Sequence, residues 1–494
     1  MTWRWWGENP VSINPALEIE EKLIMARKRK HIPPGIALAV LALTAALAGS
    51  ALAEFSGNAS LLPPGTELGE EAFDQPREVF RSESSGGHKS YLVNMGDVAF
   101  SSPLTLGGPA RQAGISCNTC HVNGTTNPKL YIPGLSTQSG TFDTTGHLFN
   151  PKADNGVLDP LTIPSLRGAH LLAPYGHDGR TLSLRDFLHN VIVNEFAGPE
   201  PSTEILDAMV AYIEDIDFVP NRRLGAAGKL TGPLSDSEKR GETLFHRPFP
   251  HDPTLSCAAC HVPTGAFVDH QQHDVGSGGL FKTPTLLNAN FNAPYFHDGR
   301  YTSYAQVVGH FDRTFYLGLS AQDRQDLVAY LQAIGDGEQA LLPDNVETRI
   351  REISDFLSVL DTAIPEHNVA IATMTLDTID RELRDLTEQF PERKNSIVSA
   401  GVEQRGQARS TLKYLVLSLH QIDSAMRSGH FDEAAADLAH SREMLSEAVP
   451  VLEASEPWSL FNRQIHDAHF AAVRQLYRLA IDPALAPRRR YDPD

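Results

Sequence analysis

The chain has 494 residues, of which 41% are hydrophobic, so it is long enough to form several domains with apolar cores. Its 61 acidic and 42 basic residues give a net charge of −19 at pH 7. Such an acidic chain is poorly suited to bind nucleic acid or anionic lipid, whereas a basic redox partner would suit it.

The first 53 residues have the composition of an export signal. A basic run at 27–30 precedes an apolar stretch at 35–53 that ends Ala-Leu-Ala. This pattern predicts a signal peptide over 25–53, cleaved after Ala53, and therefore a periplasmic protein. Because the first 24 residues fit no part of a signal peptide, translation is predicted to start at Met25. The alternative is an uncleaved anchor helix, for which the apolar run is only marginally long.

A first domain is predicted over 54–222. Its start, to about residue 90, is rich in Gly, Pro, Ser and Glu and predicts irregular chain. A helix is expected to begin near Tyr91 and to lead to the sequence Cys-Asn-Thr-Cys-His at 117–121. Two thiols three positions apart, followed at once by an imidazole, are what covalent haem attachment requires. The thiols add to the two vinyl groups of one porphyrin, and the imidazole reaches the iron as an axial ligand.

The same pattern recurs as Cys-Ala-Ala-Cys-His at 257–261, so the two copies use all four cysteines. A four-cysteine zinc site would normally place its pairs about 15 to 20 residues apart, whereas these pairs start at residues 117 and 257. Two disulfides would suit an exported protein but leave each histidine unexplained. Two covalently bound c-type haems are therefore the favoured interpretation, with zinc and disulfides as alternatives. The predicted attachment and ligand residues are Cys117, Cys120, His121, Cys257, Cys260 and His261.

An internal repeat links the two motifs. The turn at 163–166 matches 283–286, the loop Ala-Pro-Tyr-Gly-His-Asp-Gly-Arg at 173–180 matches 293–300 at all but one position, and Val-Ala-Tyr-Ile at 210–213 matches 328–331. Each half therefore has a haem motif, a proline turn, a His-Asp-Gly-Arg loop and a closing helix. The first half is longer. Its two histidines are residues 121 and 177, whereas those of the second half are residues 261 and 297.

The second domain is predicted over 223–340, after a glycine-rich linker at 221–233. Ser235 and Glu238 form a capping-box pattern that opens a helix through Phe245. Gly241 within this helix would permit a close helix crossing. Residues 320–323 give a second cap signal before the closing helix.

The region 341–494 holds no haem motif and little glycine, and it repeats the 3.6-residue apolar spacing of amphipathic helices. It predicts four or five antiparallel helices packed as a bundle. The expected fold class is thus mainly α, with two cytochrome-c-like haem domains followed by a C-terminal helical bundle. This bundle is a candidate surface for a protein partner.

With both haem motifs and both loops in view, residues 90–340 resemble the bacterial dihaem cytochrome c peroxidase and MauG superfamily. The segment 281–300 carries the resemblance most specifically. It implies a peroxidase-like oxidoreductase that reduces hydrogen peroxide at the His121 haem, with electrons entering through the His261 haem. A small periplasmic cytochrome or cupredoxin would donate these electrons. Relatives often carry calcium between the domains, although no EF-hand-like sequence indicates it here.

The resemblance also implies roles for residues outside the motifs. His147 falls where the peroxidases carry a displaceable distal histidine, and Glu195 falls near their distal glutamate if a gap of two residues is allowed. The alternatives are a loop histidine in solvent and an exposed helix-end carboxylate. Arg180 and Arg300 are predicted to pair with haem propionates, because a guanidinium beside a Gly turn can bind a carboxylate through two hydrogen bonds.

The sequence departs from the family where the second haem takes its sixth ligand. The methionine expected about fourteen residues past the loop histidine is Phe311 here. His310 is the predicted replacement, with Tyr316 and His273 as further candidates. Replacing methionine by histidine should lower the reduction potential. The family's tryptophan between the haems is also replaced, by His177. These departures favour an alternative function, a non-catalytic electron carrier that docks a partner through 341–494; a weaker alternative is a protein that oxidises a residue on its partner.

Overall fold

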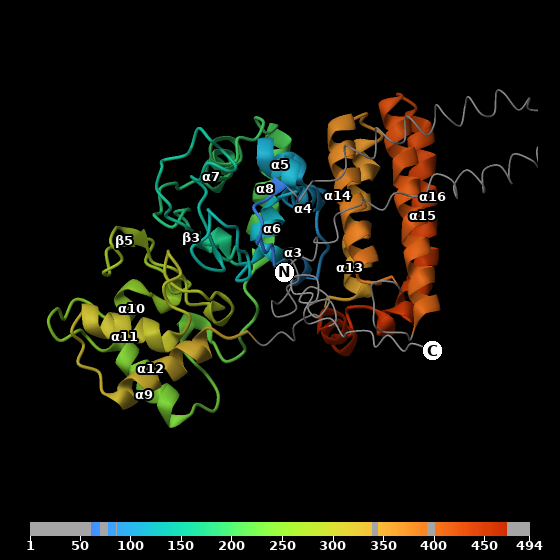
Figure 1. The fold of residues 1–494 in the computed structure, drawn as a ribbon. Helices are drawn as coiled ribbons and strands as arrows, with labels where there is room; N and C mark the ends of the chain where they lie inside the picture. Colours follow the sequence, from blue (N-terminus) through green and yellow to red (C-terminus); the bar gives the residue numbers. More distant parts are fainter. Residues whose placement is uncertain (1–60, 70–77, 85, 338–343, 393–400, 472–494) are drawn as a thin grey trace, which may run out of the picture. The chain divides into compact units, whose positions relative to one another are not determined.

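The computed structural model describes residues 61–69, 78–84, 86–337, 344–392 and 401–471 (Figure 1). The predicted signal peptide and the start at Met25 lie outside these residues. The chain divides into two compact units, 1–342 and 343–494. Helices dominate both, so the predicted mainly-α class is confirmed. Among the residues described, no helix combines the length and apolarity needed to cross a membrane.

In the first unit, two helix pairs carry the repeat predicted from the sequence. Helix α4 packs on α8, and α9 packs on α12. A glycine permits each crossing: a side chain at Gly96 would strike the Ala208 carbonyl, and one at Gly241 would strike the Asp326 carbonyl. The close crossing predicted at Gly241 is therefore confirmed. The four helices are α4 (Tyr91–Ser101), α8 (Thr203–Asp215), α9 (Asp236–His246) and α12 (Ala321–Ile334).

Equivalent aromatic residues fill the core behind each helix pair. The rings of Phe100 and Tyr212 lie 5.1 Å apart between α4 and α8, and those of Phe245 and Tyr330 lie 5.1 Å apart between α9 and α12. All four rings are almost completely buried. Since the two tyrosines come from the repeated Val-Ala-Tyr sequence, the repeat preserves the core contacts of both halves.

The helix starts follow the predicted capping signals. The Ser235 hydroxyl accepts a hydrogen bond from the Glu238 backbone N–H at 3.2 Å, and the Glu238 carboxylate accepts one from the Ser235 N–H at 2.7 Å. This is the reciprocal capping box expected from the sequence. The Ser320 hydroxyl caps α12 in the same way, through the Asp323 N–H at 3.0 Å.

Short elements connect these pairs and carry the haem motifs and loops. In the first half they are β1 (Val79–Phe80), α3 (Arg81–Ser84), η3 (Pro103–Thr105), α5 (Gly108–Ala113), α6 (Cys117–Cys120), η4 (Val122–Gly124), β2 (Thr141–Phe142), β3 (Leu161–Thr162), η5 (Ala169–Leu171), α7 (Leu184–Asn190), the π-helix η6 (Val191–Glu195) and β4 (Ile216–Asp217). In the second half they are η7 (Ala226–Gly228), α10 (Cys257–Cys260), η8 (Pro263–Gly265), β5 (Gln272–His273), β6 (Phe281–Lys282), η9 (Ala289–Phe291) and α11 (Tyr304–Thr314). The strand pairs are antiparallel: β1 with β4, β2 with β3, and β5 with β6.

The described part of the second unit contains four long helices, which Figure 1 shows lying side by side. Each packs on the next along the chain, and the first also packs on the last, so the four enclose a common core. Aliphatic residues at helical spacing fill it, including Leu357, Leu383, Leu412 and Leu445. The helices are α13 (Val346–Ala363), α14 (Val369–Glu388), α15 (Val402–Arg427) and α16 (Phe431–Ser455), followed by the short turn η11 (Glu456–Trp458).

Candidate functional site

Both predicted axial histidines are oriented by backbone carbonyls. The Nδ1 of His121 lies 3.0 Å from the carbonyl oxygen of Pro164 and 3.2 Å from that of Thr125. The Nδ1 of His261 lies 3.1 Å from the carbonyl oxygen of Phe267. Because a carbonyl only accepts hydrogen bonds, Nδ1 carries the proton in each ring and the Nε2 lone pair is left for a metal ion. Burial lowers the pKa of both histidines, which favours the neutral form that ligates iron.

The two cysteines of each pair lie one helical turn apart. The first pair is on the single-turn helix α6 and the second pair is on α10. Each helix begins at a serine: the Ser116 N–H donates to Thr119 Oγ1 at 3.1 Å, and the Ser256 hydroxyl accepts from the Ala259 N–H at 3.0 Å. All four cysteines are among the residues described, and no disulfide joins them. Burial raises the pKa of Cys117 and of Cys257 to about 12, which keeps both as neutral thiols. Each cysteine pair with its adjacent histidine fits a covalently bound haem.

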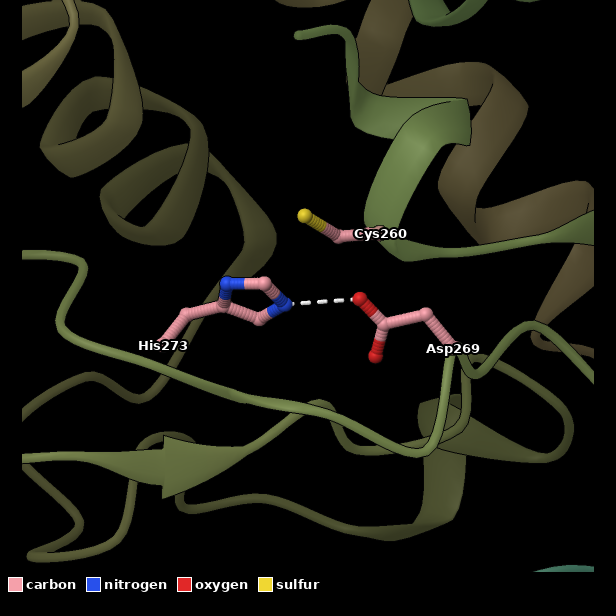
Figure 2. A group of neighbouring side chains, drawn as sticks. All are labelled: Cys260, Asp269 and His273. Atoms are coloured by element: carbon pink, nitrogen blue, oxygen red, sulfur yellow. Dashed lines mark hydrogen bonds and ion pairs between the residues drawn. The ribbon is translucent and has the colours of Figure 1, made fainter.

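One group of side chains in the described ranges also has the spacing of a metal site. Cys260, Asp269 and His273 each offer a ligand atom within 4.8 Å of the others (Figure 2). His273 Nε2 lies 2.6 Å from an Asp269 carboxylate oxygen. Burial and the nearby Asp269 carboxylate raise the pKa of the Cys260 thiol. Attachment of a haem would convert this sulfur to a thioether, so the group cannot bind a metal through a thiolate and hold the haem at once.

Glu195 directly precedes a residue of the apolar core that contacts the first haem motif. It ends the π-helix that follows α7, and the next residue, Phe196, belongs to the apolar core that also contacts Cys117 and Cys120. Its side chain is only 15% exposed. Arg180 Nη2 donates to Glu195 Oε1 at 2.8 Å, and Asn190 Nδ2 donates to the same oxygen at 3.1 Å. Glu195 is therefore not the exposed helix-end carboxylate that the sequence left open.

The charge of Glu195 is set by opposing effects. Burial raises the pKa of its carboxyl, while the Arg180 charge and hydrogen bonds from Thr144, Arg180 and Asn190 lower it, and the net change is upward. A partly buried carboxyl with a raised pKa is a candidate for general acid–base catalysis. Π-helical turns inside helices are frequent at functional sites.

His147 is directed away from this arrangement. Its side chain is 76% exposed, and Nδ1 lies 3.3 Å from an Asp154 carboxylate oxygen. Its neighbours Leu148 and Phe149 pack against the core that contacts the cysteines. In this conformation His147 is the solvent-facing loop histidine, and a role as distal ligand, which stays a prediction, would require the loop to turn it inward.

The two loop arginines, predicted to bind propionates, have different partners. Arg180 bridges Asp178 at 3.1 Å and Glu195 at 2.8 Å. Arg300 binds Asp298 of its own loop, with Nε at 2.7 and 2.9 Å from the two carboxylate oxygens. Both guanidinium groups thus already bind carboxylates, and propionate binding stays a prediction.

His310, the predicted sixth ligand of the second haem, has partners at both ring nitrogens. Nε2 donates to the Val275 carbonyl oxygen at 2.7 Å, and Nδ1 accepts from the Tyr301 hydroxyl at 3.0 Å. The residue is 8% exposed. Ligation of iron through Nε2 would require the Val275 hydrogen bond to break, so this role stays a prediction.

The two His-Asp-Gly-Arg loops meet the strands of the opposite half. The Thr162 N–H of β3 donates to the His297 carbonyl oxygen at 2.7 Å, and the Lys282 N–H of β6 donates to the His177 carbonyl oxygen at 2.9 Å. Side chains also donate hydrogen bonds to the loop of the opposite half. Gln138 Nε2 donates to the Gly299 carbonyl oxygen, and Gln272 Nε2 donates to the Asp178 carbonyl oxygen. The repeat thus forms a pseudo-symmetric contact between the halves.

Lys282 adds a buried cation to this contact. Its Nζ donates to the carbonyl oxygens of Leu172 at 2.8 Å and Pro174 at 2.7 Å, both from the first half. Burial lowers its pKa to about 8. Sequence reasoning missed Lys282, Thr144, Asn190 and Tyr301 as site residues. The position of Lys282 within the segment 281–300 was the available signal; nothing in the sequence pattern marked the other three.

Residues 236–380 match the family described as di-haem cytochrome c peroxidase. Among curated relatives, the hydrazine synthase subunit gamma of Kuenenia stuttgartiensis is 26% identical over 328 residues, which cover 54% of this chain and 83% of that protein. A cytochrome-c peroxidase of Pseudomonas sp. (strain SCT) is 36% identical over 89 residues, or 16% of this chain and 23% of the relative. The methylamine utilization protein MauG of Methylorubrum extorquens is 30% identical over 126 residues, or 19% and 34%.

These matches confirm the resemblance predicted from the haem motifs and loops. The chain spans most of the hydrazine synthase subunit but only about a quarter to a third of the peroxidase and of the MauG protein. The family implies haem as a cofactor, and the carbonyl-anchored histidines suit it.

Proposed function

Because residues 236–380 match the di-haem cytochrome c peroxidase family and the chain has peroxidase and MauG relatives, we propose that it is a periplasmic, peroxidase-like oxidoreductase with two covalently bound c-type haems. Two cytochrome-c-like domains, 54–222 and 223–340, would each hold one haem, and the helical region 341–494 would follow them. Hydrogen peroxide is reduced at the His121 haem, and electrons enter through the His261 haem.

One observation carries the assignment of the chemistry to the first haem. Both halves have an anchored axial histidine, but fifteen residues after the loop arginine the first half carries a partly buried carboxyl, Glu195, where the second carries Phe315. Splitting the O–O bond of a peroxide requires a group that takes a proton from one oxygen and delivers it to the other. In the second half the structurally equivalent region contributes aromatic rings.

The residues of this chain then have distinct roles. His121 and His261 would hold the two haem irons, and the haems would supply the redox chemistry, in which two electrons from the donor and two protons convert hydrogen peroxide to two waters. Glu195 accepts the first proton from the bound peroxide and returns it to the departing oxygen. Arg300 would be available to a propionate, as would any Arg180 donor not bound to Asp178 or Glu195. His147 would reach the distal side if its loop turned inward, and His310 would be the sixth ligand of the second haem.

The partners follow from charge and compartment. An acidic surface favours a basic donor, so a small periplasmic cytochrome or cupredoxin supplies the electrons. No nucleic acid is involved. The helical region 341–494 provides a surface for a further protein.

The test is spectroscopic and compares Glu195→Gln with the wild type. Absorption and low-temperature EPR spectra of ferric and half-reduced protein, with and without hydrogen peroxide, should show one high-spin haem whose signal disappears on peroxide addition. In Glu195→Gln the rate of this change should fall by about a hundredfold or more. The control is Glu200→Gln, an exposed carboxylate of the same half that binds His189; its rate should stay unchanged. An equal rate in Glu195→Gln would remove Glu195 from the mechanism.

A second candidate is a non-catalytic dihaem electron carrier that docks a partner through 341–494. It is favoured by the match to the gamma subunit of a hydrazine synthase and by the replacement of the expected methionine by Phe311. Two low-spin haems that remain unchanged on peroxide addition would establish this reading and overturn the first.

A further inference from the structure

We propose that Arg180 is a positioning residue that holds the Glu195 carboxylate in one orientation beside the first haem motif. This rests on the proposed function, because it assigns a second residue to the same proton-transfer site. It differs from the propionate role predicted for this arginine, since its partner here is a residue of the chain itself.

The guanidinium is held on three sides. Nη1 donates to Asp178 at 3.1 Å, Nη2 donates to Glu195 Oε1 at 2.8 Å, and the Phe187 ring lies 5.1 Å from Cζ. A planar guanidinium fixed in this way presents its donor at a defined place, which a flexible ammonium group would not. Asn190 donates to the same Oε1 at 3.1 Å. The carboxylate therefore has one oxygen bound by two donors from different elements.

The second half provides an internal comparison. Each loop arginine is followed by a serine-capped helix that starts four residues later, α7 after Arg180 and α11 after Arg300. Counting the same fifteen residues from each arginine reaches Glu195 in the first half and Phe315 in the second. Phe315 stacks on Phe311, with ring centroids 6.0 Å apart. Arg300 binds Asp298 of its own loop, and the carboxylate of α11, Asp312, pairs with Arg324.

Counting from Arg180 and Arg300 in the same way also shows that the hydrogen-bond partner of Glu195 has a different equivalent in the second half. Asn190, which donates to Glu195, has His310 as its equivalent, and His310 binds Tyr301 and Val275. The duplication has therefore kept the arginine while changing what it can hold. This divergence indicates that the contact between Arg180 and Glu195 belongs to the first haem site and not to the shared scaffold.

Loss of Arg180 should change the charge state of Glu195 in a known direction. The charged groups near Glu195 are Arg180 itself and Asp178 on the far side of the guanidinium; Asn190 from α7 and Thr144 from the 143–150 loop are uncharged. Without Arg180, burial acts on the carboxyl with less opposition, so its pKa should rise. Since Glu195 must be ionised to accept a proton, the acid side of the pH profile should move to higher pH.

The experiment compares Arg180→Gln and Arg180→Lys with Arg185→Gln as the matched control. Arg185 pairs with Asp207 at 2.6 Å in the same half and is 43% exposed, outside the site. In the haem-loaded protein, infrared difference spectra would follow the C=O band of protonated Glu195 against pH, with Glu195→Gln identifying the band. The pH dependence of cyanide binding and of peroxide reduction would be measured on the same samples.

In Arg180→Gln the infrared titration should move upward, and rates on the acid side should fall about tenfold for each unit of that movement. Arg180→Lys should recover part of the loss, because it keeps the charge, and Arg185→Gln should match the wild type. An unmoved Glu195 titration in a folded Arg180→Gln protein with both haems would overturn the positioning role. A moved titration together with wild-type peroxide reduction in Glu195→Gln would support the positioning role and overturn the catalytic role of Glu195.

Discussion

The two halves of the first unit keep the same scaffold but differ on one helix. Both have a glycine-permitted helix crossing, an anchored axial histidine and a His-Asp-Gly-Arg loop whose backbone contacts the other half. The helix after the loop differs: it carries Asn190 and Glu195 in the first half and His310 and Phe315 in the second. The duplicated parts are those proposed to hold a haem, and the parts that have diverged include Glu195, the proposed proton-transfer residue.

The additional residues of the first half are a second difference between the two halves. In the first half 43 residues separate His121 from Pro164, the residue whose carbonyl anchors it. The shorter second half places Pro284 much nearer to His261 in sequence. The additional residues therefore lie before the proline turn, in the segment that contains Thr144 and His147, and Thr144 is a hydrogen-bond partner of Glu195.

The largest expected effect comes from removing one cysteine pair at a time. Cys117→Ser with Cys120→Ser should leave one covalent haem per chain, and Cys257→Ser with Cys260→Ser should leave the other, because two thioether bonds hold each group. Intact-protein mass and the pyridine haemochrome spectrum measure the haem content. Only the first pair should abolish the peroxide-sensitive signal. Loss of that signal with the second pair alone would reverse the roles assigned to the two halves.

A smaller effect is expected where each half crosses its helices. Gly96→Val and Gly241→Val place a branched side chain against the Ala208 and Asp326 carbonyls, which belong to packed helices and cannot move aside. Each should lower the free energy of unfolding of its half by about 3 kcal/mol. Calorimetric scans that resolve separate transitions for the two halves would test whether the equivalence extends to stability.

The control for this pair is Gly309, a half-buried position on α11. A methyl group at Gly309 would meet only the end of the Arg313 side chain, at 3.4 Å. Gly309→Ala should therefore stabilise the second half by about 0.5 kcal/mol, through reduced freedom of the unfolded chain. Similar destabilisation in all three variants would show that the crossings have no special dependence on glycine.

Much of this scaffold was predictable because its signals are local. Ser235 and Ser320 mark helix starts within four residues, the haem motif is five residues long, and Gly241 falls inside an amphipathic pattern. The repeat then places the second copy of each feature. The proline turns at 163–166 and 283–286 were recognised as repeated, although not as the source of a carbonyl for each histidine.

The polar contacts of the candidate site were not predictable by the same route. Thr144 reaches Glu195 across about fifty residues, and Arg180 does so only because its loop folds back on α7. The π-helix that turns Glu195 inward breaks the 3.6-residue period on which helix prediction relies. Lys282 binds backbone carbonyls, which have no signature in a sequence.

The smallest expected effect distinguishes the two loop histidines. His177 Nε2 lies 2.7 Å from the Thr162 carbonyl oxygen, and burial, with His297 and Lys282 nearby, lowers its pKa to about 4. His297 stacks on Phe281 with ring centroids 3.7 Å apart, and burial lowers its pKa as well. Between pH 6.5 and 4 the unfolded chain therefore binds more protons at these positions than the folded chain.

This difference in proton binding makes the folded state lose stability as the pH falls through that range, since stability rises with pH wherever the unfolded state holds more protons. The contribution of His177 should be present above pH 6.5 and lost toward pH 4, with a size of about 1–3 kcal/mol. His177→Gln should flatten the fall in melting temperature over this range, and His297→Gln should flatten it less, because His297 has no carbonyl partner among the hydrogen bonds described and is more accessible to water. Equal flattening by both variants would mean that the two loops remain equivalent at the contact between the halves and have diverged only beyond it, on the helices that follow.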